Sequence, residues 1–140
     1  MDVSVERIAG TMTRDLVETR PAEKGIVLWW LGQAGFAVRF GDFFGLIGPY
    51  LSDSLAKKYA GTRKPHDQMM PPPVLPEEVR GLRTVLCSHA HSDHMDPDAL
   101  GTLARTNPDC AFVVPEAALT VALDRGLPRE RVLPTNAGTR

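Results

Sequence analysis

The sequence predicts an α/β fold, and three observations lead to this class. From residue 83 onward, short β-branched and aromatic runs alternate with helical patterns, which is typical of strands and helices packed in layers. Three more strand patterns lie close together between residues 26 and 47, as in a meander. A histidine-rich loop, residues 89–94, falls between a predicted strand and a predicted helix. Open α/β sheets often bind ligands at such a junction.

The N-terminal part begins with a predicted amphipathic helix and continues into the meander. Apolar residues recur at helical spacing over residues 3–18, at Val5, Ile8, Met12 and Leu16. We interpret residues 1–24 as an N-terminal extension and residues 25–140 as part of one domain. The run Ile26–Leu31 predicts a strand that is buried on both faces, because all its members are bulky and apolar. Strands over residues 36–40 and 43–47 follow, joined by a tight turn.

The middle of the chain, residues 49–76, is rich in proline and contains a basic cluster. Proline removes a backbone donor and restricts the residue before it, so this segment is predicted to have little regular structure. Loops of this length in compact domains are usually functional or mobile. A short helical turn is expected at residues 76–79, just before the next strand.

The C-terminal part predicts alternating strands and helices. A buried strand is expected over residues 84–88, followed by a helix with Asp96 as its N-cap and Pro97 at its first position. Another strand is expected over residues 110–114, and then a helix from Pro115 to about Asp124 that ends at Gly126. Residues 131–133 predict a last short strand.

Composition limits the classes of function. The 140 residues are 43% apolar, which suits one globular domain, and the net charge of −1 does not suggest a nucleic-acid-binding polycation. We find no apolar run near the ~20 residues that a membrane span needs, and the charged residues 1–20 lack the apolar centre of a signal peptide. The two cysteines form no Cys-x-x-Cys pair. We therefore expect a cytoplasmic protein that binds neither nucleic acid nor a membrane.

The loop His89-Ala90-His91-Ser92-Asp93-His94 predicts a metal site. Imidazole nitrogen and carboxylate oxygen are ligands that Zn²⁺ and similar divalent ions prefer in catalytic sites. A tight loop can direct His89 and His91 toward one ion, and Asp93 and His94 toward a second. We expect one or two divalent ions, Zn²⁺ or Mn²⁺. A polar loop that merely contains histidines is the alternative.

The His-x-His-x-Asp-His motif after a buried strand resembles the signature of the metallo-β-lactamase fold. Upstream, residues 30–36, 49–54 and 70–72 resemble the UlaG-like branch, which includes L-ascorbate-6-phosphate lactonases. The resemblance implies a four-layer αββα sandwich, with this chain as its N-terminal half. It also implies a metal-dependent hydrolase that uses a metal-activated hydroxide on a small-molecule substrate, namely a lactone or a phosphorylated sugar-acid-like compound. It assigns Asp93 the catalytic role of orienting the attacking water.

Two departures from the resembled pattern bear on activity. The family takes further ligands from its second half, yet no histidine follows His94 here. We therefore expect the chain to be the N-terminal part of a longer protein, or to pair with another copy, and to hydrolyse substrates poorly alone. Gly48 stands where the family usually has an acid that braces the metal loop. Gly48→Asp should then tighten metal binding, unless Gly48 is needed for a backbone turn.

Several readings stay open at the level of sequence. His66 is interpreted as a solvated loop histidine. The basic residues of the middle segment either bind a substrate phosphate or form a solvated surface; they are Lys57, Lys58, Arg63 and Lys64. A phosphodiesterase or nuclease on the same fold is a second enzymatic reading. A non-catalytic metal-binding or interaction fragment is the third.

Overall fold

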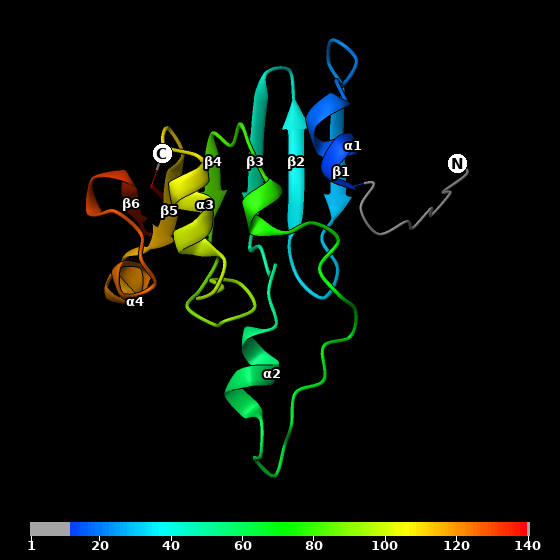
Figure 1. Cartoon of the computed structure of the whole chain (residues 1–140). Coiled ribbons are helices and arrows are strands. Elements are labelled where there is room, and N and C mark those ends of the chain that lie inside the picture. The colour runs from blue at the N-terminus through cyan, green and yellow to red at the C-terminus, as the bar shows by residue number, and fades with distance from the viewer. Residues whose placement is uncertain (1–11, 140) are drawn as a thin grey trace.

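The computed structural model describes residues 12–139, which form one mixed sheet in the order β1-β2-β3-β4-β5-β6 (Figure 1). The first three strands are antiparallel: β1 (Ile26–Trp30), β2 (Phe36–Phe40) and β3 (Phe43–Ile47). The other three run parallel to β3: β4 (Thr84–Leu86), β5 (Ala111–Pro115) and β6 (Val132–Thr135). The predicted α/β class is confirmed, and each predicted strand lies within two residues of its expected bounds.

The helices are short and lie in the connections. They are α1 (Met12–Glu18), α2 (Ser54–Tyr59), α3 (Leu100–Thr106) and α4 (Leu119–Asp124), with 3-10 turns at Pro76–Glu78, Glu116–Ala118 and Arg129–Arg131. Residues 12–18 of the predicted first helix are helical, and its earlier part lies outside the described residues. No helix in the described range is both long and apolar enough to cross a membrane.

The prediction of little regular structure after residue 49 was wrong for α2. This helix begins at Ser54, whose side chain is buried together with Leu55. The Tyr50 hydroxyl accepts a hydrogen bond from Leu55 N at 3.2 Å. A buried anchor thus stabilises a helix of six residues that is too short to form on its own.

The two faces of the sheet differ, and the prediction that the first strand is buried on both faces was wrong. One face packs against the helices and the loops: Ala37 is fully buried, and Arg39 donates to Leu16 O of α1 at 2.7 Å. The other face exposes a row of aligned apolar side chains across the strands, including Trp30, Phe36, Ile47 and Leu86. Residues 12–139 therefore form one sheet with helices and loops on one face, and the four-layer sandwich stays a prediction.

Candidate metal centre

The metal loop, residues 88–96, leaves the carboxyl end of β4 at the middle of the sheet. Cys87 continues the extended chain past β4, because its N–H donates to Val113 O at 2.9 Å. The loop then closes a tight turn in which His94 N and Met95 N both donate to His91 O, at 3.1 and 2.8 Å. This turn gathers the predicted ligands at the carboxyl ends of the parallel strands, where open α/β sheets place their sites.

The four predicted ligands lie together. The ring centroid of His89 is 4.5 Å from that of His91 and 4.3 Å from that of His94. Asp93 Oδ2 is 3.6 Å from His94 Nε2, and the Ser88 hydroxyl contacts His89 Nδ1 at 2.9 Å. Because His89 is about equally near both other rings, these distances do not divide the ligands into the two expected pairs.

The electrostatics of the loop suit metal ligation. Desolvation lowers the pKa of His89, and the His94 and His91 rings lower it further. The neutral imidazole that results is the form that binds a metal. Within residues 12–139 no three His, Cys, Asp or Glu side chains are already placed around a single metal position. The donor types and their proximity fit a divalent ion, but these side chains would have to reorient around it.

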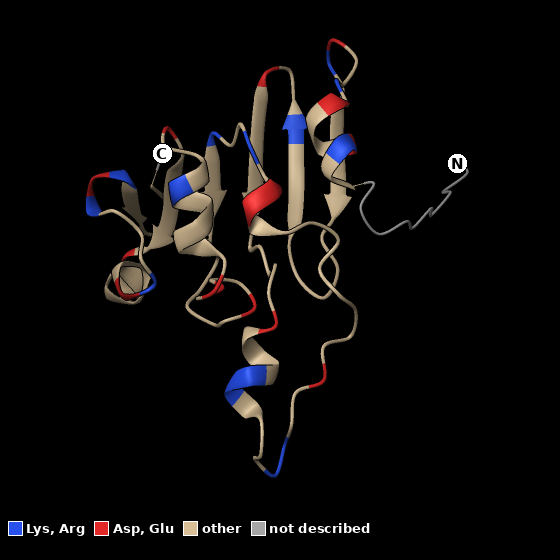
Figure 2. Cartoon of the chain, in the orientation of Figure 1, with Lys and Arg blue, Asp and Glu red and all other residues tan. Residues whose placement is uncertain are grey.

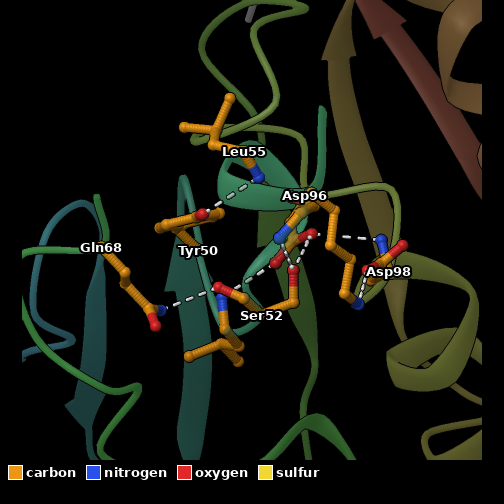
Figure 3. A network of polar contacts seen from close by, with 9 residues as sticks. Tyr50, Ser52, Leu55, Gln68, Asp96 and Asp98 are labelled. Atoms are coloured by element: carbon orange, nitrogen blue, oxygen red, sulfur yellow. Dashed lines mark hydrogen bonds and ion pairs between the residues drawn. The ribbon is translucent and has the colours of Figure 1, made fainter. Parts of the chain in front are cut away.

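Asp96 anchors the end of the metal loop (Figure 3). Its fully buried carboxylate accepts hydrogen bonds from Leu51 N at 2.9 Å and from the Ser52 hydroxyl at 2.7 Å. It also accepts one from Asp98 N at 3.1 Å. The Asp98 contact caps a turn, not a helix: α3 begins only at Leu100, with Ala99 as its N-cap. The prediction of Asp96 as N-cap and Pro97 as the first helical residue was therefore wrong. Sequence reasoning missed the contacts to residues 51 and 52, which are more than forty positions away.

Gly48 lies directly beneath the metal loop. Its N–H donates to Leu86 O at 2.7 Å, and its φ of +52° is in the left-handed region. A Cβ built on Gly48 would lie 2.9 Å from His94 Nδ1. A side chain at this position would be strained and would press on a predicted ligand, so the structure favours the backbone interpretation of Gly48 over the missing-brace interpretation.

A hollow of about 340 Å³ lies beside the metal loop. One wall is the loop itself, including His91 and Asp93, and the other is formed by side chains of α2, the following loop and the end of α4. His66 lines this hollow, is half-buried, and lies 2.9 Å from Gln33 Nε2. The interpretation of His66 as a merely solvated histidine was therefore wrong, since the packing of the long loop against residues 32–35 cannot be read from local sequence.

Only one of the four basic residues predicted as candidates for substrate binding lines the hollow. Lys58 lines it, whereas Lys57 pairs with Asp98 at 2.7 Å, and the exposed Arg63 and Lys64 do not line it. Arg125, which the sequence analysis did not single out, also lines the hollow and donates from Nη1 to Met95 O. By position, Lys58 and Arg125 are therefore the two basic side chains beside the predicted ligands, and a role in substrate binding stays a prediction.

Comparison with known proteins gives matches over much of the chain. No family model matches. The chain is 30% identical over 95 residues to N-acyl-phosphatidylethanolamine-hydrolyzing phospholipase D 1 of Caenorhabditis elegans. The alignment covers 67% of this chain and 26% of that protein. It is 23% identical over 144 aligned positions to the probable L-ascorbate-6-phosphate lactonase UlaG of Shigella boydii. This second alignment covers 91% of this chain and 41% of that protein.

A solved structure shares the fold. CmlA, a diiron β-hydroxylase from Streptomyces venezuelae, superposes with a TM-score of 0.51 and 24% sequence identity, over 83% of this chain and 22% of that one. The chain thus spans less than half the length of each of these relatives. The sequence matches agree with the resemblance found from the histidine motif.

Proposed function

We propose that this chain, which resembles the metallo-β-lactamase-fold hydrolases and their UlaG-like branch, forms part of a metal-dependent hydrolase. The observation that carries the proposal is the gathering of His89, His91, Asp93 and His94 in one loop at the carboxyl ends of the parallel strands. The named hydrolases among its relatives support the same class.

The chain's residues have defined parts in this proposal. Four side chains of the metal loop would hold one or two divalent ions, Zn²⁺ or Mn²⁺: His89, His91, Asp93 and His94. When bound, such an ion supplies a strong nucleophile from water at neutral pH and stabilises developing negative charge. Ser88 orients His89 through its hydrogen bond to Nδ1. Asp93 would orient the attacking water.

For the substrate we propose a lactone or a phosphorylated sugar-acid-like molecule, in a cytoplasmic setting. The UlaG match supports this class, and the cationic side chains beside the metal loop suit a negatively charged molecule. A phosphodiester substrate is the second candidate, because the Caenorhabditis elegans relative is a phospholipase D. A non-catalytic metal-binding module would take up metal without turnover.

Metal uptake is the first test. We expect the chain to bind Zn²⁺ or Mn²⁺ in equilibrium dialysis followed by elemental analysis. The double variant His89→Ala/His91→Ala should lose most of that uptake, because it removes two neighbouring donors. His66→Ala is the matched control, since it removes the one histidine outside the loop and should bind metal like the wild type. Equal metal content in the wild type and both variants would contradict the proposal.

Turnover separates the candidate functions. Metal-loaded protein would be assayed on a sugar-acid lactone, its phosphorylated form and bis(p-nitrophenyl) phosphate, with and without a chelator. Chelator-sensitive lactone opening supports the favoured class, whereas faster cleavage of the phosphodiester would replace it by the second candidate. Because this chain spans under half of its relatives, we expect slow turnover by the isolated chain.

A further inference from the structure

We propose that the hollow between the metal loop and α2 is a subsite for a phosphoryl group of the substrate, bound by Lys58, His66 and Arg125. The inference rests on the proposed function, which puts the reacting bond at the metal loop. The same hollow is lined by His91 and Asp93, two of the predicted metal ligands. A group bound there would therefore hold the rest of the substrate against the site of reaction.

Lys58 supplies a positive charge that forms no ion pair with a carboxylate of residues 12–139. Its neighbour Lys57 is engaged with Asp98, with Nζ 2.7 Å from Oδ2. Lys58 instead lies over the Tyr59 ring, with Nζ 5.3 Å from the centroid, and both side chains line the hollow. Figure 2 shows this basic stretch of α2 extending below the sheet, away from the other helices. The two adjacent lysines thus differ in their contacts despite their identical chemistry.

His66 lines the hollow, and its contact with Gln33 decides which of its ring nitrogens can donate a hydrogen bond. Gln33 Oε1 accepts from Met69 N at 3.2 Å, which fixes the orientation of the Gln33 amide. Gln33 Nε2 must then donate to His66 Nε2, 2.9 Å away, so this ring nitrogen is an acceptor. The proton of the neutral ring consequently lies on Nδ1. Gln33, in the turn between β1 and β2, thereby sets which nitrogen of His66 can donate to a ligand.

Arg125 closes the subsite from the end of α4. It follows the last residue of α4, Asp124, and its Nη1 donates to Met95 O in the metal loop, which holds the guanidinium beside the hollow. Asp93 is the one carboxylate among the described lining residues, and the proposed metal would engage it. The remaining charged groups of the lining, Lys58 and Arg125, are both cationic.

A phosphoryl group suits this lining better than a carboxylate. The three donors come from α2, the following loop and the end of α4, so they approach from separate segments. A phosphoryl group offers three acceptor oxygens in different directions, whereas a carboxylate offers two in one plane. Arginine and lysine together are a common combination for binding phosphate.

The test is a titration of the metal-free chain, dialysed after chelator treatment, with inorganic phosphate and separately with acetate. Backbone amide shifts in a ¹⁵N-labelled sample would locate binding. We expect saturable shifts with phosphate at Tyr59, His66 and Ser92, and weaker binding of acetate. Lys58→Ala should raise the apparent dissociation constant for phosphate about tenfold, the scale of one charge-assisted hydrogen bond.

Matched variants make the result specific. Lys64→Ala removes an exposed charge outside the hollow and should leave phosphate binding unchanged, and Lys58→Arg should largely restore it. Equal binding by the Lys58→Ala and Lys64→Ala variants, or shifts that do not saturate and spread over all exposed basic residues, would overturn the subsite. Tighter binding of acetate would overturn the phosphoryl assignment. Because no metal is present, the outcome is independent of the metal-uptake test.

Discussion

The two walls of the hollow are built in different ways. The metal loop is anchored in the core: Met95 and Asp96 are fully buried, and Ser92 is nearly so. Across the hollow, residues 57–65 are exposed. The loop after α2 is held by a few polar contacts, among them those between Gln33 and His66 and between Gln68 Nε2 and Ser52 O. The wall that carries the predicted metal ligands is thus buried and anchored, whereas the wall proposed to bind the substrate is exposed and loosely held.

Ser52 connects the two walls. Its hydroxyl donates to Asp96 on the metal-loop side, and its carbonyl accepts from Gln68 on the side of the long loop (Figure 3). A substitution in the metal loop should therefore lower the stability of the whole protein. A substitution in the loop after α2 should change only the local opening of that loop. The following predictions test this difference.

Asp96→Ala should have the largest effect. The change leaves the buried N–H of Leu51 and the Ser52 hydroxyl without their acceptor, which should lower the free energy of unfolding by about 2–4 kcal/mol. Urea denaturation measures the change. Asp98→Ala is the control, since it removes a carboxylate two residues away whose ion pair is exposed. A loss no greater than that of the control would show that Asp96 is not an anchor.

Gly48→Ala should have an intermediate effect. The left-handed backbone and the contact with His94 should together lower the free energy of unfolding by about 1–2 kcal/mol. Displacement of His94 should also weaken Zn²⁺ binding, measured by calorimetric titration. Tighter binding in Gly48→Asp, with the fold intact by circular dichroism, would instead restore the idea of a missing bracing carboxylate.

Alkaline pH should weaken the core beside the rigid wall. Burial raises the pKa of the Cys87 thiol to about 12 and that of Cys110 to about 11. Both thiols stay neutral in the folded state while their unfolded forms ionise near their ordinary pKa, about 8.5. The unfolded state then binds fewer protons, so stability should fall as pH rises from about 9 toward 11. Urea midpoints across this range check the slope, which Cys87→Ala should reduce; an unchanged slope would contradict the assignment.

Gln33→Ala should have the smallest effect on global stability. It removes the contacts to His66 and to Met69 N, both on the loose wall. We expect a urea midpoint close to that of the wild type. Tryptic cleavage after Arg63 should be faster, because the loop after α2 opens locally more often. If the midpoint fell as far as in Asp96→Ala, the two walls would not differ in the way proposed.

The sequence was sufficient for those features that depend on short stretches of chain. The strands at residues 36–40 and 43–47 follow from apolar runs around a tight turn, and the metal loop follows from donor types at close spacing. These signals are local, because strand patterns and ligand spacing arise among residues that are neighbours in the chain. The class of the fold and the four candidate ligands could therefore be predicted.

Tertiary structure decided the features that depend on distant residues. It placed Leu51 and Ser52 on Asp96, Gln33 against His66, and Arg125 beside the metal loop. It also left one face of β1 exposed, although the apolar run Ile26–Trp30 predicts burial on both sides. Burial and long-range hydrogen bonds depend on which segments meet in space, and residue periodicity along one segment carries no information about its partner.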